Sequence, residues 1–183
     1  MTMDNTFKLP ESTRRIFLKR TLLALGASVA PALVSRAIAG GASLDTGTGG
    51  RQPSVLSADD YRILDVVADT FIPRGGAFEM GARDIDLATR IDGFLALDKP
   101  EVATGVKGAL QYVEHNAPSL AGSEGKFSDL SLAARTEVLQ AMAAGSDPLA
   151  VQVFAGLKEL CMFYFYSDDA SWPNIGYDGP WVR

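Results

Sequence analysis

Five segments of this 183-residue chain space their apolar residues for one face of an α-helix, and residues that start or stop helices separate them. The first segment starts with Ser57 as N-cap and Asp60 at the capping-box position, and it ends before Pro73, because the residue before proline avoids helical angles. Its inward positions are Tyr61, Leu64, Ala68 and Phe71. No stretch alternates with period two over enough residues to predict a strand.

Four further helices are marked in the same way. They are expected over about residues 86–97, from Asp98 with Pro100 in the first turn to Asn116, from Ser131 to a C-cap at Gly145, and from Asp147-Pro148 to about Tyr166. We therefore predict an all-α fold, a small bundle of about five helices with an aromatic-rich, irregular C-terminal tail.

An export signal precedes the helical region. Residues 13–19 match every position of the S/T-R-R-x-F-L-K pattern of twin-arginine signals, through Arg14, Arg15, Phe17, Leu18 and Lys19. The apolar stretch 21–34 that follows is shorter than the ~20 residues of a transmembrane helix. Ala37 and Ala39 then supply the small residues of a signal-peptidase site. This order predicts a periplasmic protein that the twin-arginine translocase exports in its folded state.

The chain divides into three parts on this reading. Residues 1–39 form the signal peptide, residues 40–55 form a flexible linker rich in glycine, and residues 56–183 form the helical domain. The sequence leaves open whether the signal is cleaved or is kept as a weak membrane anchor.

The charge of the domain excludes some partners. Six of the 17 basic and two of the 22 acidic residues lie before residue 40, so the remainder carries a net charge of −9. An acidic surface repels phosphate backbones and anionic lipid headgroups, because like charges repel. We expect no binding to nucleic acid.

Residues suited to catalysis are few. The chain has one histidine, His115, and one cysteine, Cys161, whereas the usual zinc, copper and iron sites need two or more such ligands. It contains no C-x-x-C-H, G-x-G-x-x-G, P-loop or G-x-S-x-G motif. We interpret His115 as a partner of a helix C-terminus, and Asp168 and Asp169 as solvated or capping carboxylates. The sequence therefore predicts no catalytic, cofactor-binding or metal-ligating residue in this chain.

The C-terminal region carries the most distinctive composition. Residues 162–166 read Met-Phe-Tyr-Phe-Tyr, and a helix turns about 100° per residue, so these side chains cannot share one face. In one alternative the tail folds back over them through Trp172, Ile175, Tyr177 and Trp181. In the other they meet a partner protein. The candidate interface residues are Cys161, Phe163, Tyr164, Phe165, Tyr166, Trp172, Tyr177 and Trp181.

The tail also resembles a known family. Residues 165–180 read F-Y-S-D-x-x-x-W-P-x-I-G-Y-D-G-P, which is similar to the signature of gluconate 2-dehydrogenase subunit 3 proteins. Residues 69–73, Gly81-Ala82 and residues 91–94 resemble the N-terminal half of that family, and residues 127–135 with Leu139 resemble its middle. The resemblance covers roughly residues 56–181 and includes the twin-arginine signal.

The resemblance implies a non-catalytic small, or gamma, subunit. Its partner would be a large FAD-dependent dehydrogenase of the glucose–methanol–choline type, which oxidises a sugar or alcohol and lacks its own export signal. The small subunit escorts the folded flavoprotein through the twin-arginine pore and stabilises or matures it. A cytochrome c subunit passes electrons to the membrane chain, which would place the complex at the outer face of the inner membrane. Some members carry an intersubunit disulfide, for which Cys161 is the one candidate here; the alternative for this residue is a free thiol buried in the core.

A second class of function stays open on the residues alone. The chain would then be a stand-alone periplasmic ligand-binding protein or enzyme, in which the aromatic tail lines a pocket. Asp168, Asp169 or Tyr177 would be its polar anchors.

Overall fold

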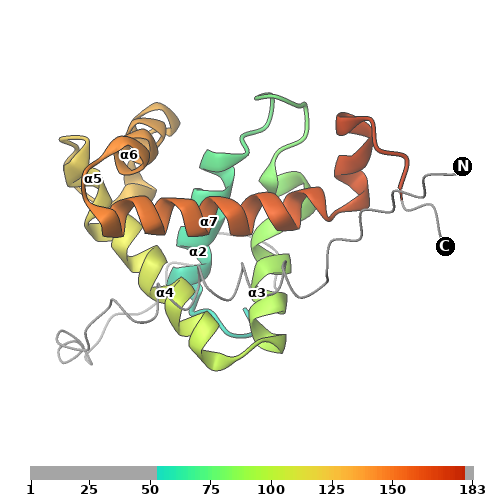
Figure 1. Ribbon diagram of the computed structural model, residues 1–183, viewed down its shortest axis with the longest axis horizontal. Helices are drawn as coiled ribbons and strands as arrows, with labels where there is room; N and C mark the ends of the chain where they lie inside the picture. The colour runs from blue at the N-terminus through green and yellow to red at the C-terminus, as the bar shows by residue number, and fades with distance from the viewer. Residues whose placement is uncertain (1–52, 180–183) are drawn as a thin grey trace, which may run out of the picture.

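The computed structural model describes residues 53–179, and within that range the chain is helical and contains no β-strand (Figure 1). The α-helices are α2 (Ala58–Phe71), α3 (Leu87–Leu97), α4 (Pro100–His115), α5 (Ala117–Leu120), α6 (Leu132–Ala144) and α7 (Pro148–Tyr166). Three short 3-10 helices are η1 (Ala82–Ile85), η2 (Phe127–Asp129) and η3 (Asp169–Ile175). The predicted all-α bundle is confirmed.

Helix α7 organises the bundle. It crosses the front of the molecule in Figure 1 and packs against α6, α3, α4 and α2, while η3 turns back against its C-terminal end. The core is built from apolar side chains of the α-helices and of η1 and η2, and its largest fully buried members are Phe127, Phe165, Leu64, Leu87, Ile91, Leu110, Met142, Leu157 and Leu160. Burial of such side chains is the main force that holds the helices together.

Three of the predicted caps are formed as expected. The side chains of Ser57, Ser131 and Asp147 accept hydrogen bonds from the backbone N–H groups of Asp60, Ala134 and Leu149, at 3.1, 3.3 and 2.9 Å. Each bond satisfies a helix N–H that has no partner inside its own helix. The starts of α2, α6 and α7 were therefore readable from the sequence.

Other helix ends differ from the prediction. Asp60 does not complete a capping box, because its carboxylate accepts the hydroxyl of Ser57 at 2.7 Å and the amide of Gln111 at 2.7 Å. Asp98 lies outside α4 and accepts the N–H of Lys99 instead of capping the helix. Gly145 ends α6 with extended angles, φ −70° and ψ 164°, so the left-handed C-cap is absent there.

The region after α7 is also more regular than predicted. In place of an irregular tail, residues 169–175 form the seven-residue 3-10 helix η3, which Asp168 caps. Gly176 follows with φ +68°, a left-handed conformation that glycine adopts without steric cost. The short helix α5 and the other 3-10 turns were not predicted, because single turns carry too little periodic pattern.

Buried carboxylates fasten the loops to the bundle. Asp92 of α3 is 3% exposed and accepts the N–H groups of Ser54, Val55 and Leu56. Glu114 of α4 accepts both the N–H and the hydroxyl of Ser128. Ser54 and Val55 are the last residues of the predicted linker, so the folded body already holds the chain at that point.

Helix α7 has the length and composition of a membrane-crossing segment, with a mean hydropathy of 1.2 over 18 residues. It is the one helix among residues 53–179 with this property. A core helix meets the same criterion, and α7 packs against four other helices of the bundle. Its hydropathy therefore has a sufficient cause in the fold itself.

Candidate protein-docking surface

The aromatic run at the end of α7 divides between the core and the surface. Phe165 is fully buried, whereas Phe163 and Tyr166 are 46% and 39% exposed. Tyr164 is half-buried between α7 and α3, where its ring lies 5.1 Å from the ring of Phe94. Burial and the negative charge of Asp98 raise the pKa of the Tyr164 hydroxyl above its ordinary value. Of the four rings, Phe163 and Tyr166 are therefore the ones available to a partner, and Phe165 belongs to the core.

Cys161 lies in the core as well. Its side chain is completely buried among the helices, and this burial raises the pKa of the thiol to about 12. The structure thus places Cys161 in the core, and its thiol does not reach the surface. An intersubunit disulfide at Cys161 would require the packing around this thiol to open.

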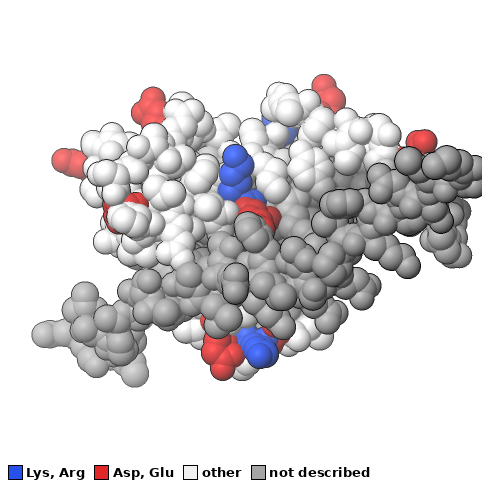
Figure 2. Space-filling view, viewed as in Figure 1, with Lys and Arg blue, Asp and Glu red and all other residues white. Residues whose placement is uncertain are grey.

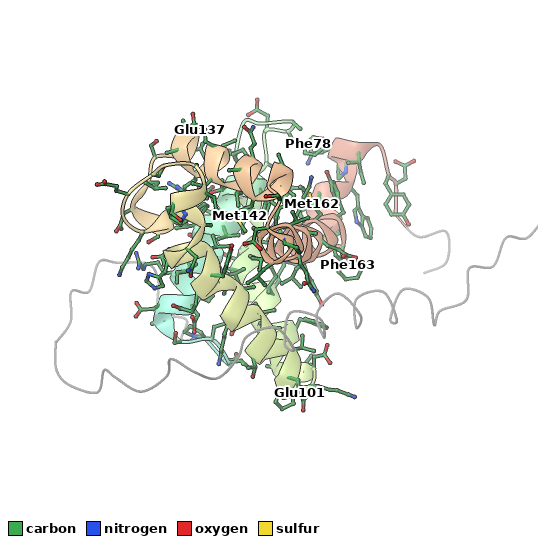
Figure 3. All side chains as sticks on the ribbon, turned by 60° about the vertical axis from the view of Figure 1, so that its left-hand side comes forward. Phe78, Glu101, Glu137, Met142, Met162 and Phe163 are labelled. Carbon is green, nitrogen blue, oxygen red and sulfur yellow. The ribbon has the colours of Figure 1, made fainter. Side chains whose placement is uncertain are left out.

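A small apolar pocket lies beside the exposed rings. The loop between α2 and η1 contributes Phe78 and Met80, and α7 contributes Met162 and Tyr166; the other lining residues are Phe71, Ile72, Pro73 and Ala77. Met162 lies on the side of α7 that faces Phe78, while Phe163 points in another direction (Figure 3). The pocket holds about 80 Å³, well below the ~300–1,000 Å³ of small-molecule sites.

Sequence reasoning missed Phe78 and Met80. The loop that carries them closes on itself, since the N–H of Ala82 donates to the carbonyl of Ile72 at 2.9 Å. A side chain at Gly81 would lie 2.5 Å from the backbone nitrogen of Arg74, so this close approach requires glycine. Two large apolar residues between Gly76 and Gly81 were the available signal.

The tail adds further exposed apolar side chains. The indole N–H of Trp172 donates to the carbonyl of Tyr166 at 3.1 Å, and the indole ring meets Tyr177 edge-on at 5.1 Å. Ile175 and Tyr177 remain 46% and 42% exposed. The tail thus folds back in part, through Trp172, while Ile175 and Tyr177 face outward. Contact of these outward-facing side chains with a partner stays a prediction. We call Phe163, Tyr166, Ile175 and Tyr177, with the adjacent pocket, the docking surface.

The C-terminal part of α7 carries no charged side chain after Glu159, whereas the tail carries the exposed carboxylates of Asp169 and Asp178. In the part of the face over α7 that is drawn in white and colour, the space-filling view shows mostly uncharged atoms, with a basic and an acidic group near the centre and acidic groups near the edges (Figure 2). Helix α7 itself holds two charged residues, Lys158 and Glu159, and the Lys158 ammonium lies over the ring of Phe154 at 5.5 Å. Exposed aromatic residues with charged groups beside them have the composition of a protein–protein interface, which has an apolar centre and a polar rim.

The polar residues singled out in the sequence have different surroundings. Asp168 is buried and caps η3 through the N–H of Ala170 at 2.8 Å, whereas Asp169 is exposed. His115 is exposed in the last turn of α4. Among residues 53–179, no three His, Cys, Asp or Glu side chains are placed to hold a metal ion.

Several predicted site residues lie outside the described range. They are the signal residues Arg14, Arg15, Phe17, Leu18 and Lys19, the cleavage-site residues Ala37 and Ala39, and the interface candidate Trp181.

Fold and surface together define a small helical domain with exposed apolar side chains at the end of α7 and on the tail. The chain belongs to the gluconate 2-dehydrogenase subunit 3 family, whose model matches residues 58–179, about two thirds of the sequence. This family supplies a subunit of a multi-subunit dehydrogenase complex. No curated protein and no solved structure shows significant similarity to the chain.

Proposed function

We propose that this chain is the non-catalytic small subunit of an FAD-dependent sugar or alcohol dehydrogenase of the periplasm. It binds the large, FAD-carrying subunit through the docking surface and stabilises or matures that subunit. It also escorts the folded flavoprotein through the twin-arginine pathway. The complex then works at the outer face of the inner membrane, where a cytochrome c subunit accepts its electrons.

The observation that carries this proposal is the docking surface in a chain of this family. Phe163 and Tyr166 are adjacent on one side of α7, with large apolar areas left in contact with water. Exposed aromatic side chains of this kind supply most of the binding energy when a partner covers them. The adjacent pocket suits one apolar side chain of the partner better than a whole sugar.

Co-purification tests the subunit assignment. The chain carries a C-terminal affinity tag, the periplasmic fraction is isolated, and the bound proteins are identified by mass spectrometry and flavin absorbance. We expect a yellow complex with a large FAD protein that oxidises a sugar or alcohol. A colourless chain that purifies alone from cells expressing the large subunit would contradict the proposal.

Export of the large subunit tests the escort role. Replacing Arg14 and Arg15 together by lysine keeps the charge but removes the arginine pair of the signal. We expect both subunits to remain in the cytoplasm, in a complex that still contains FAD. A large subunit that reaches the periplasm with this variant has another route of export, and the escort role is then wrong.

A further inference from the structure

Arg90 of α3 connects two segments that are far apart in the sequence. Its Nε donates to the carbonyl of Ile85, at the end of η1, over 3.0 Å. Its Nη2 forms an ion pair with Oδ2 of Asp168, the residue that begins the tail. One guanidinium thus joins the end of η1, before α3, to the second residue after α7, which its fixed fork of donors allows.

Asp168 depends on this contact. Its side chain is 2% exposed, and its Oδ1 already accepts the N–H of Ala170. Within residues 53–179, Oδ2 has no hydrogen-bond partner, and Arg90 is its ionic partner. A buried carboxylate is costly unless its charge is compensated, so without Arg90 this carboxylate would favour a position in water.

Asp168 is also the point at which the tail is fixed. Its carbonyl accepts the hydroxyl of the fully buried Ser171 at 2.7 Å, and its carboxylate caps η3. Farther along, Trp172 holds η3 to the end of α7 through the carbonyl of Tyr166. The position of η3 in turn sets where Ile175 and Tyr177 lie relative to Tyr166.

We propose that Arg90 is a positioning residue for partner binding. By holding Asp168 in the bundle, it keeps η3 against α7, so that the tail and the helix present one continuous apolar surface. The large dehydrogenase subunit binds this closed arrangement, and it binds poorly when the tail swings free. The partner-binding part of this inference rests on the proposed function.

Arg83 provides a matched control for Arg90. Both arginines are about half exposed, and Arg83 bridges Asp65 at 3.0 Å and Asp69 at 3.4 Å, both on α2, so among the described residues it makes no ion pair with the tail. The variants are therefore Arg90→Gln and Arg83→Gln. Arg90→Lys is added because lysine keeps the charge but cannot make both contacts from one planar group.

Hydrogen exchange tests, without any partner, whether Arg90 holds the tail against α7. In Arg90→Gln we expect the amides of residues 170–177 to exchange at least tenfold faster than in the unchanged chain, while the amides of α4 keep their rates. Arg83→Gln should leave the tail rates unchanged, and Arg90→Lys should lie between the two. Unchanged tail rates in a folded Arg90→Gln protein would overturn the proposal. If that variant does not fold, Arg90→Lys decides, with the same criterion.

Binding to the large subunit tests the positioning role. We expect Arg90→Gln to weaken the complex at least tenfold and Arg83→Gln to leave it unchanged. Equal affinity of Arg90→Gln and the unchanged chain would overturn the role of Arg90 in binding. If the unchanged chain does not bind the large subunit at all, the proposed function is wrong, and the exchange rates still decide whether Arg90 holds the tail.

Discussion

The first turns of α7 and its last two turns are both rich in apolar residues, but they differ in how many of these side chains are buried. In the first part, the buried side chains Ala150, Val153, Leu157 and Leu160 recur every three or four residues and face the bundle. In the last part, residues 161–166 are all apolar or aromatic, yet Cys161 and Phe165 alone are buried there. The bundle covers one side of the helix along its whole length. In the last two turns, a side chain is therefore buried because it lies on the side of α7 that faces the bundle, and its hydrophobicity alone does not decide this.

Truncation of Phe165 should give the largest effect, because this ring fills the core. We expect Phe165→Ala to lower the free energy of unfolding by about 3–5 kcal/mol, a large share of the stability of a domain of this size. Phe163→Ala, two residues away on the exposed side, should change it by less than about 1 kcal/mol. Urea unfolding followed by circular dichroism measures both. Equal losses for the two variants would show that the two sides of α7 do not differ as described.

Replacement of the exposed rings should weaken partner binding and leave the stability of the fold nearly unchanged. We expect the double variant Phe163→Ser/Tyr166→Ser to weaken the complex with the large subunit by about 2–4 kcal/mol, since aromatic anchors dominate interface energies. Leu97→Ser is the control, because this side chain is 89% exposed at the end of α3. Affinity is measured by titration of the purified large subunit. A comparable loss in the Leu97 variant would place the interface elsewhere or make it nonspecific.

The side of α7 that is buried could have been read from the sequence. Val153, Leu157, Cys161 and Phe165 are spaced by four, and all four are buried. Extending this row from the amphipathic first part into the aromatic run separates Phe165 from Phe163. The composition of the aromatic run alone does not tell which side of the helix faces the bundle. For this reason the sequence alone predicts both Phe163 and Phe165 as interface residues.

The rest of the surface depends on contacts between distant residues. Arg90 and Asp168 carry no local signal of their pairing, and the pocket at Phe78 exists because the loop returns to its start at Gly81. Helix caps such as Ser57 and Asp147 act within a few residues, so local sequence predicts them. Contacts made by tertiary packing leave no comparable pattern in a single sequence.

Cys161 should also behave as a core residue, and its replacement should cost less stability than that of Phe165. The raised thiol pKa of about 12 means that almost no thiolate forms at pH 8, and burial blocks access. We expect a thiol reagent to label native protein at least a hundredfold more slowly than urea-unfolded protein. Cys161→Ser should cost roughly 1–3 kcal/mol, because it buries a hydroxyl in an apolar site. Rapid labelling of the native chain would show that the thiol is accessible. A gel band that contains both subunits and disappears on reduction would show that Cys161 lies at the interface.

The smallest effect should come from Asp92, which anchors the opposite, N-terminal end of the described chain. Burial alone would raise the pKa of this carboxyl, but hydrogen bonds from the N–H groups of Leu56, Ser54 and Val55 outweigh it and lower the pKa below its ordinary value of 3.8. A carboxylate with a lowered pKa in the folded state contributes stability that is fully present above that ordinary value. This contribution is lost as the pH falls through the lower, folded-state pKa.

Comparison of Asp92→Asn with the unchanged chain isolates this contribution. The difference in unfolding free energy should be constant near neutral pH and should shrink as the pH falls below about 3.8. Asp178→Asn, a change at an exposed carboxylate of the tail, controls for the loss of one negative charge. Faster hydrogen exchange at residues 54–56 in Asp92→Asn at neutral pH, with unchanged exchange at residues 170–177, would show that the two ends of the chain are held by independent carboxylates. Equal loosening of both ends would instead mean that α3, which carries both Asp92 and Arg90, opens as a unit, and the tail would then be no more mobile than the bundle that supports it.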